Sequence, residues 1–180
     1  MKVSAKYLRQ FDAVRDGGER VTEPPEDFAA RMQDTVLPNW PSEILIEWFH
    51  RHAGHISQYA HLGFERFKFN REVWPLCKIP GRESFRDPRF CDDFNNIQTR
   101  ASNPNDWLAK YMQSHGTWNT PIVLLRVFGS TRGRKGVQLR RPLHLLEGHR
   151  RLAFLVGLRS LGRASSEHNV WVVNLDRCAV

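Results

Sequence analysis

The stretch LHLLEGHRRLAFLVGL, residues 143–158, decides the fold, because an apolar strand pattern changes here within a few residues into a helical one. We expect a strand over residues 141–146 and a helix from about residue 150 to 161. Gly148 stands between them, where a glycine lets the backbone pass close to a ligand. The first N–H groups of a helix have no helical acceptor and point toward such a ligand. The junction therefore predicts a site for an anion.

The charges around this glycine support an anion site. The expected helix begins with His149, Arg150 and Arg151, cations that the helix dipole disfavours unless an anion lies among them. Glu147 precedes the glycine at the end of the strand, where its carboxylate can hold Mg²⁺ or act as a general base. In the alternative interpretation Glu147 pairs with Arg150 or Arg151 and Gly148 only shapes the turn. The spacing is equally compatible with both.

The patterns on either side predict a compact mixed β-sheet with helices, an α+β fold preceded by a helical extension. We expect residues 1–70 to form that extension, packed on the core, and residues 71–180 to form one compact domain. The expected loops are residues 16–26, 79–93 and 129–141. The expected elements are helices over 26–35 and from 41–43 onward, a strand over 72–79, a helix from 103–106 to Gly116, and strands over 120–128 and 169–175.

Composition limits the function classes. The 180 residues include 27 Lys and Arg against 19 Asp and Glu, a formal charge of +8, which favours a polyanionic partner. No apolar run reaches the roughly 18 residues of a membrane span, and the N-terminus does not resemble a signal peptide. We therefore expect a cytoplasmic protein without membrane insertion. Three widely spaced cysteines, Cys77, Cys91 and Cys178, predict free buried thiols and neither a disulfide framework nor a zinc site.

Two blocks of sequence resemble the ParB/sulfiredoxin-like superfamily, which includes ParB partition proteins, sulfiredoxins and free serine kinases. LLEGHRRLAFLVGL, residues 145–158, is similar to its (D/E)-G-x-x-R-L-A signature. MQSHG, residues 112–116, followed by PIVL, residues 121–124, resembles the helix end and strand that precede that signature in the family. With the strand before them, the blocks cover about residues 72–175, while residues 1–70 have no counterpart.

The resemblance implies roles for individual residues. It assigns Gly148 and His149 to a phosphate cradle, Arg151 to gripping the phosphates and Arg150 to a second basic position. Glu147 corresponds to the acidic residue of nucleotide-using members. Sulfiredoxins carry their catalytic cysteine where this chain has His149, so sulfinic acid reduction is not expected. His115, at the end of the preceding helix, is either a nucleotide contact or a helix cap.

Within the superfamily the chain is most similar to plasmid-encoded fertility-inhibition and oncogenic-suppression proteins. This resemblance implies ATP hydrolysis, cleavage of DNA, and inhibition of plasmid or T-DNA transfer through a type IV secretion system, whose ATPase or coupling protein would be a partner. The chemistry of Glu147 adds Mg²⁺ as the expected metal for the hydrolysis. The alternative is a non-catalytic nucleotide- or DNA-binding module that docks on a secretion or partition ATPase. A free amino acid kinase would need an acceptor pocket that the sequence does not show.

A second group of cations predicts contacts with a DNA backbone, although an ordinary solvated hairpin tip has the same composition. The basic loop over residues 82–89 is a further candidate rim. The tryptophans are expected mainly in the core, and if one of them is exposed, we expect it to be Trp118 beside the anion site. His50, His52 and His55 lack the spacing of a metal site. The cations of the second group are Arg132, Arg134, Lys135, Arg140 and Arg141.

Overall fold

The computed structural model describes residues 5–16, 21–52, 56–81, 96–128 and 139–176, which divide into two compact units. Of these residues, the first unit contains those up to Phe69 together with Phe128, Leu139 and residues 174–176. The second unit contains the described residues of 70–127 and 140–173. The second unit thus begins next to the predicted boundary at residue 70, whereas short parts of the predicted single domain group with the first unit.

The first unit is helical and has an aromatic core. Its elements are α1 (Ala5–Arg9), α2 (Pro25–Thr35), α3 (Ser42–Ile44), a π-helical turn over Leu45–His50, and two 3₁₀ turns over Ala60–Leu62 and Phe64–Arg66. Trp40 packs edge-on against Phe49 and Phe64, with ring centroids 4.8 and 5.8 Å apart. Its indole N–H donates to the Phe64 carbonyl at 3.0 Å, so this buried tryptophan has its hydrogen-bond partner.

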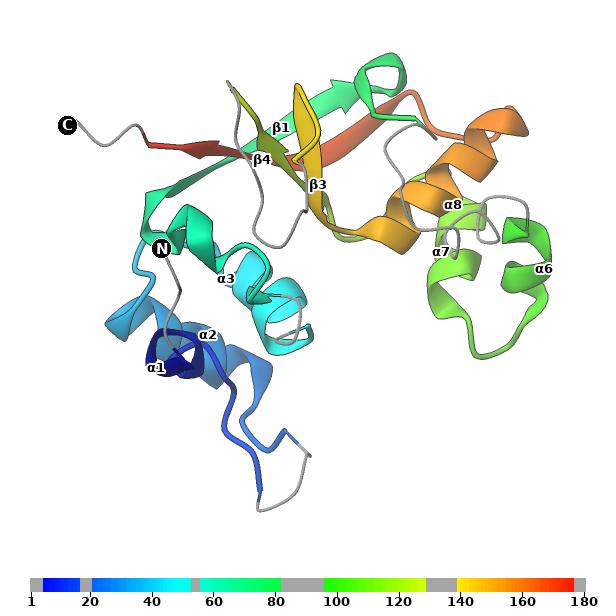
Figure 1. Cartoon of the computed structure of the whole chain (residues 1–180). Helices are drawn as coiled ribbons and strands as arrows, with labels where there is room; N and C mark the ends of the chain where they lie inside the picture. The colour runs from blue at the N-terminus through cyan, green and yellow to red at the C-terminus, as the bar shows by residue number, and fades with distance from the viewer. Residues whose placement is uncertain (1–4, 17–20, 53–55, 82–95, 129–138, 177–180) are drawn as a thin grey trace. The chain divides into compact units, whose positions relative to one another are not determined.

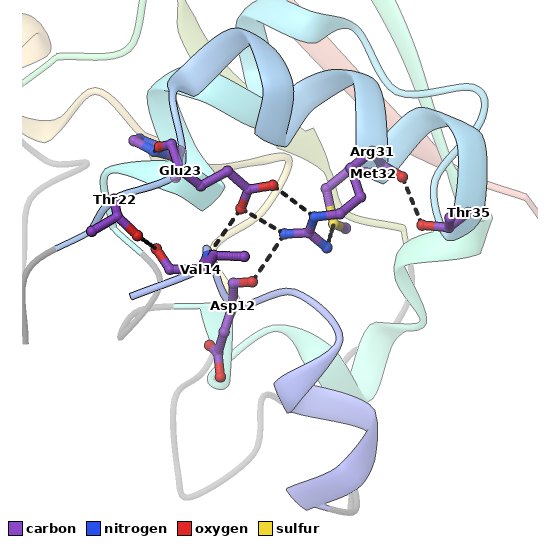
Figure 2. Close-up of polar contacts among 8 residues, drawn as sticks. Asp12, Val14, Thr22, Glu23, Arg31, Met32 and Thr35 are labelled. Carbon is purple, nitrogen blue, oxygen red and sulfur yellow. Dashed lines mark hydrogen bonds and ion pairs between the residues drawn. The ribbon is translucent and has the colours of Figure 1, made fainter. Parts of the chain in front are cut away.

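An ion pair joins α2 to the chain that precedes it (Figure 2). The Arg31 guanidinium donates to both oxygens of Glu23, at 2.7 and 2.8 Å, and to the Asp12 carbonyl at 3.1 Å. Glu23 also accepts from the Val14 N–H at 3.0 Å. Hydrogen bonding to Arg31 lowers the pKa of the Glu23 carboxyl. Glu23 and Arg31 therefore both have partners within the first unit, and we assign both charged side chains a structural role.

The second unit contains most of a four-stranded sheet with the order β1-β4-β2-β3 (Figure 1). Strand β2 (Ile122–Arg126) runs parallel to β4 (Glu167–Leu175) and antiparallel to β3 (Leu143–Glu147). Strand β1 (Phe67–Pro75) lies beside β4 in the opposite direction, since the Leu76 N–H donates to the Ser166 carbonyl at 2.8 Å, next to the start of β4. The expected mixed α+β architecture is thereby confirmed.

Three helices pack together on one face of this sheet: α6 (Ile97–Ser102), α7 (Trp107–His115) and α8 (His149–Ser160). In Figure 1, α7 lies between α6 and α8. The core between helices and sheet contains Ile122 and Leu124 of β2 and Leu152 and Leu155 of α8. Residues Val123 and Leu125, on the other face of β2, are also buried, which confirms the prediction of a strand buried on both faces.

Several predicted boundaries are confirmed and others are wrong. Helix α7 ends at Gly116, which is left-handed at φ 69°, and Gly162 closes α8 at φ 67°. The first strand lies earlier than expected, because the chain turns into a 3₁₀ helix (Leu76–Lys78) after Pro75. Within that turn Cys77 is exposed, not buried as predicted. Helix α6 was not expected, since six residues carry too little periodicity to reveal a helix.

Candidate functional site

The predicted strand-to-helix corner exists, and Gly148 has the backbone that only glycine adopts easily. Gly148 follows β3 directly, has φ 94° and ψ 28°, and precedes the first residue of α8. A Cβ at this position would lie 2.6 Å from Cγ2 of Ile122, the first residue of β2. The close approach that requires glycine is therefore to the Ile122 side chain. No side-chain hydrogen bond caps this end of α8 in the described part of the chain.

Arg151 is held by the protein itself. Its side chain is only 9% exposed, and Nη1 donates to the Thr120 carbonyl at 2.9 Å and to the Pro121 carbonyl at 3.4 Å. Nη2 lies 3.4 Å from Oε1 of Glu147. The guanidinium thus connects the first turn of α8 to the residues just before β2. The contacts of Arg151 describe a structural anchor, and phosphate binding by this residue stays a prediction.

Glu147 occupies the last position of β3, opposite Val123 of β2. Its side chain is 14% exposed, and its Oε1 faces Arg151. The pairing named in the alternative interpretation is present, with Arg151 as the partner. At 3.4 Å the contact is longer than a strong charge-assisted hydrogen bond, so the carboxylate remains able to bind a further donor or a cation.

Arg150 pairs with a carboxylate that lies 44 residues earlier in the chain. Its Nη2 donates to Oδ2 of Asp106 at 2.7 Å, and the guanidinium lies 5.1 Å from the centre of the Phe154 ring. Asp106 is the N-cap of α7, because its other oxygen accepts from the Ala109 N–H at 3.2 Å. One carboxylate therefore lies near the positive ends of two helices and near the Arg150 cation. The sequence indicated that a helix begins within residues 103–106 but did not indicate this ion pair.

His149 and His115, both predicted to contact nucleotide, lie at different places. His149 is the first residue of α8 and is half-buried. His115 ends α7, and its Nδ1 is 2.9 Å from the Tyr111 carbonyl and 3.0 Å from Oγ of Ser114. The Asp106–Arg150 pair is at the opposite end of α7, about 13 Å away along a helix of this length. The structure therefore does not bring His115 to the Gly148 corner.

The predicted DNA-binding cations are described only in part. Arg132, Arg134 and Lys135 lie outside the described residues, as do residues 82–89 of the predicted rim. Arg140 is half-buried, and its backbone N–H donates to Nδ1 of His144 at 3.2 Å. Arg141 is exposed. The role of this group stays a prediction.

Trp118 is buried, as expected of most of the tryptophans, whereas Trp107 is exposed, so the choice of Trp118 as the exposed ring is wrong. Trp118 is 4% exposed, and its indole N–H donates to the Asn169 carbonyl at 2.7 Å. Its ring also packs beside His168, at 5.1 Å between centroids. The residue belongs to the contact between the turn after α7 and the start of β4, where an apolar ring removes more surface from water than it could at the rim.

Sequence reasoning missed His168, a buried histidine in the same contact. His168 is 1% exposed, with Nδ1 2.8 Å from Oγ1 of Thr117 and Nε2 3.0 Å from the Ser165 carbonyl. Burial lowers the pKa of His168, and the nearby Arg159 charge acts in the same direction. Nothing in the sequence signals this role, because Thr117 and His168 are 51 residues apart.

Neither a metal cluster nor a membrane helix is found in the described residues. No group of three or more His, Cys, Asp or Glu side chains lies together there. His50, one of the three clustered histidines, lies 2.9 Å from the Glu23 carbonyl through Nε2, and His55 is outside the described residues. None of the described helices combines the length and apolar character that a membrane crossing requires.

Comparison with known proteins adds no relative. No family model matches the chain, and no match is found among curated proteins or among solved structures.

Proposed function

We propose that this chain is a ParB/sulfiredoxin-like protein that hydrolyses ATP and cleaves DNA, and that it inhibits transfer of a plasmid or T-DNA through a type IV secretion system. The observation that carries the proposal is the β3–Gly148–α8 corner. There a left-handed glycine begins a helix without a side-chain cap, and the first turn contains cations and no carboxylate. The resemblance of residues 145–158 to the superfamily signature supplies the reaction.

In this proposal each residue of the corner has a separate role. The N–H groups of the first turn of α8 and the His149 side chain bind phosphate oxygens. Glu147 takes a proton from the attacking water or hydroxyl. Arg151 acts as a positioning residue, because its contacts to the Thr120 carbonyl and to Glu147 fix the carboxylate relative to β2.

Mg²⁺ fits the corner with Glu147 as its protein ligand. Magnesium in nucleotide sites is held by one or two carboxylates together with phosphate oxygens. The carboxylate of Asp106, which contacts the first turn of α8, is engaged by Arg150 and by the Ala109 N–H. When bound, the ion would neutralise charge on the phosphates.

One observation favours the alternative of a non-catalytic module. Arg150, Arg151 and Glu147 all have protein partners, so the corner is stable without a reacting ligand. In that case the chain binds nucleotide or DNA, or docks on a secretion or partition ATPase, and needs no proton transfer by Glu147.

The Glu147→Gln variant tests the proposal. The amide keeps an oxygen for Arg151, so folding is expected to be retained, while loss of a general base lowers a rate by about 10²- to 10⁴-fold. We expect Mg²⁺-dependent ATP hydrolysis and nicking of supercoiled plasmid to fall by that amount. Glu167→Gln, an exposed carboxylate of β4, is the matched control and should retain both activities.

The same pair of variants separates the two functions in cells. If Glu147→Gln hydrolyses ATP and nicks plasmid as fast as the wild type, the catalytic assignment is wrong. If the wild type lacks both activities and Glu147→Gln still inhibits conjugation, the docking function replaces the proposed one. Arg151→Ala is unsuitable for this test, because it removes a buried anchor and would lower stability directly.

A further inference from the structure

Helix α7 has a solvent-facing surface made of rings and cations. Successive residues of an α-helix are about 100° apart, which places five side chains on one continuous arc. Trp107 is 55% exposed, Lys110, Ser114 and His115 are exposed, and Tyr111 is half-buried. The buried side of the helix carries Ala109 and Met112, which belong to the core. We call the arc formed by Trp107, Lys110, Tyr111, Ser114 and His115 the α7 face.

The rings of the α7 face form a row along the helix. Trp107, Tyr111 and His115 are spaced four residues apart and therefore follow one another on the surface. Tyr111 and His115 are stacked, with centroids 4.0 Å apart and planes 10° from parallel. The contacts of His115 Nδ1 with the Tyr111 carbonyl and Ser114 Oγ fix the imidazole plane. A large exposed tryptophan at the start of this row has no explanation in the packing of the core.

Cations lie at both ends of the row. Lys110 donates to the Pro104 carbonyl at 3.3 Å, and Arg150 is bound to Asp106 beside Trp107. At the other end Arg163 donates to the Gln113 carbonyl at 3.4 Å. Helix α7 itself contains no carboxylate. Asp106, which precedes it, is buried and paired with Arg150, so these two charges compensate each other, and the positive charge beside the aromatic rings of the α7 face comes from Lys110 and Arg163.

We propose that the α7 face binds single-stranded nucleic acid, with bases stacked on Trp107 and along the ring row and phosphates near Lys110 and Arg163. The inference rests on the proposed action on DNA and adds where the strand lies. Rows of aromatic rings flanked by cations are how proteins hold unpaired strands, whereas the bases of a duplex are stacked on one another. From Trp107 to His115 the face is about 12 Å long.

The test is binding of fluorescein-labelled dT₁₂ to the full chain in EDTA, which prevents cleavage, at 50 and 200 mM salt. Trp107→Ala should weaken binding by about 5- to 150-fold, the range for loss of one base stack. Trp107→Phe keeps a ring and should recover most of the affinity. Val73→Ala changes an exposed apolar residue of β1 and should bind as the wild type does. Lys110→Ala should reduce the slope of log K against log salt by about 0.7.

The proposal is overturned if Trp107→Ala binds dT₁₂ as tightly as the wild type, if duplex DNA binds equally well through Trp107, or if poly-glutamate of equal charge competes as effectively as dT₁₂. Failure of the proposed function has a different signature. Suppose that Glu147→Gln and the wild type are equally inactive toward ATP and plasmid, but that dT₁₂ binding depends on Trp107. The proposed hydrolysis is then refuted, and the proposed binding of single-stranded nucleic acid by the α7 face is supported.

Discussion

Gly148 and Arg151 show how single residues make the corner between β3 and α8. The glycine gives the backbone a left-handed conformation where Ile122 leaves no room for a Cβ. Arg151 then ties the first turn of α8 to the carbonyls before β2. Both residues lie at the predicted anion site, and contacts within the protein explain both of them. A residue that matches a binding motif can therefore be needed mainly to give the site its shape.

Two glycine variants separate backbone strain from steric overlap. Gly162→Ala, at φ 67° with nothing within 4 Å of the added methyl, should cost about 1–2 kcal/mol of unfolding free energy from its left-handed backbone alone. Gly148→Ala carries the same strain and also overlaps Ile122, so we expect a further loss of about 1–3 kcal/mol. Urea denaturation of both variants measures the difference. Equal losses would mean that Ile122 moves aside freely.

At the scale of elements, Asp106 connects the start of α7 to the start of α8. It caps α7 through Ala109 and pairs with Arg150 on α8. Arg150, one of the cations in the first turn of α8, is compensated by Asp106 and does not need a bound anion. The sequence predicted that an anion such as phosphate stabilises these cations. For Arg150 this prediction is weaker, because Asp106 already supplies the negative charge.

Replacing Asp106 in two ways separates the cap from the ion pair. Asp106→Asn keeps a capping oxygen and loses only the charge, so its cost should stay below about 1 kcal/mol, because Arg150 is 45% exposed and solvent screens the pair. Asp106→Ala also loses the cap and should cost about 1 kcal/mol more. Thermal or urea unfolding gives both values. An Asn variant as unstable as the Ala variant would show that the charge dominates.

At the scale of the whole molecule, the buried His168 links stability to pH. Its folded-state pKa is lowered by burial, so the unfolded chain binds a proton more readily than the folded one. The contribution is therefore fully favourable above the ordinary value of 6.5 and is lost as pH falls below it. His168 holds Thr117 and the Ser165 carbonyl together, so the loss concerns the contact between the end of α7 and β4.

The expected measurement is a free energy of unfolding that declines as pH is lowered from about 7.5 to 5.5. His168→Gln should be less stable at pH 7.5 and should show a smaller decline over that range. His115→Gln replaces an exposed histidine and should leave the decline in place. A profile unchanged by His168→Gln would assign the pH dependence to other groups.

The sequence by itself determined the elements whose information is local. The apolar run of β2, the glycine between β3 and α8, and the helix ends at Gly116 and near residue 161 were predicted because turn chemistry and periodicity act over a few residues. The pairing of Glu147 with Arg151, four residues along the chain, was also among the predicted alternatives.

Only the tertiary structure decided which distant residues meet. It paired Arg150 with Asp106, placed Ile122 against Gly148, buried Trp118 and His168, and left Trp107 exposed. These outcomes depend on how the helices and the sheet pack, and packing energy is shared among residues far apart in the chain. Local sequence shows which side chains a helix carries, but the neighbours that cover one side of it decide which of them remain for binding.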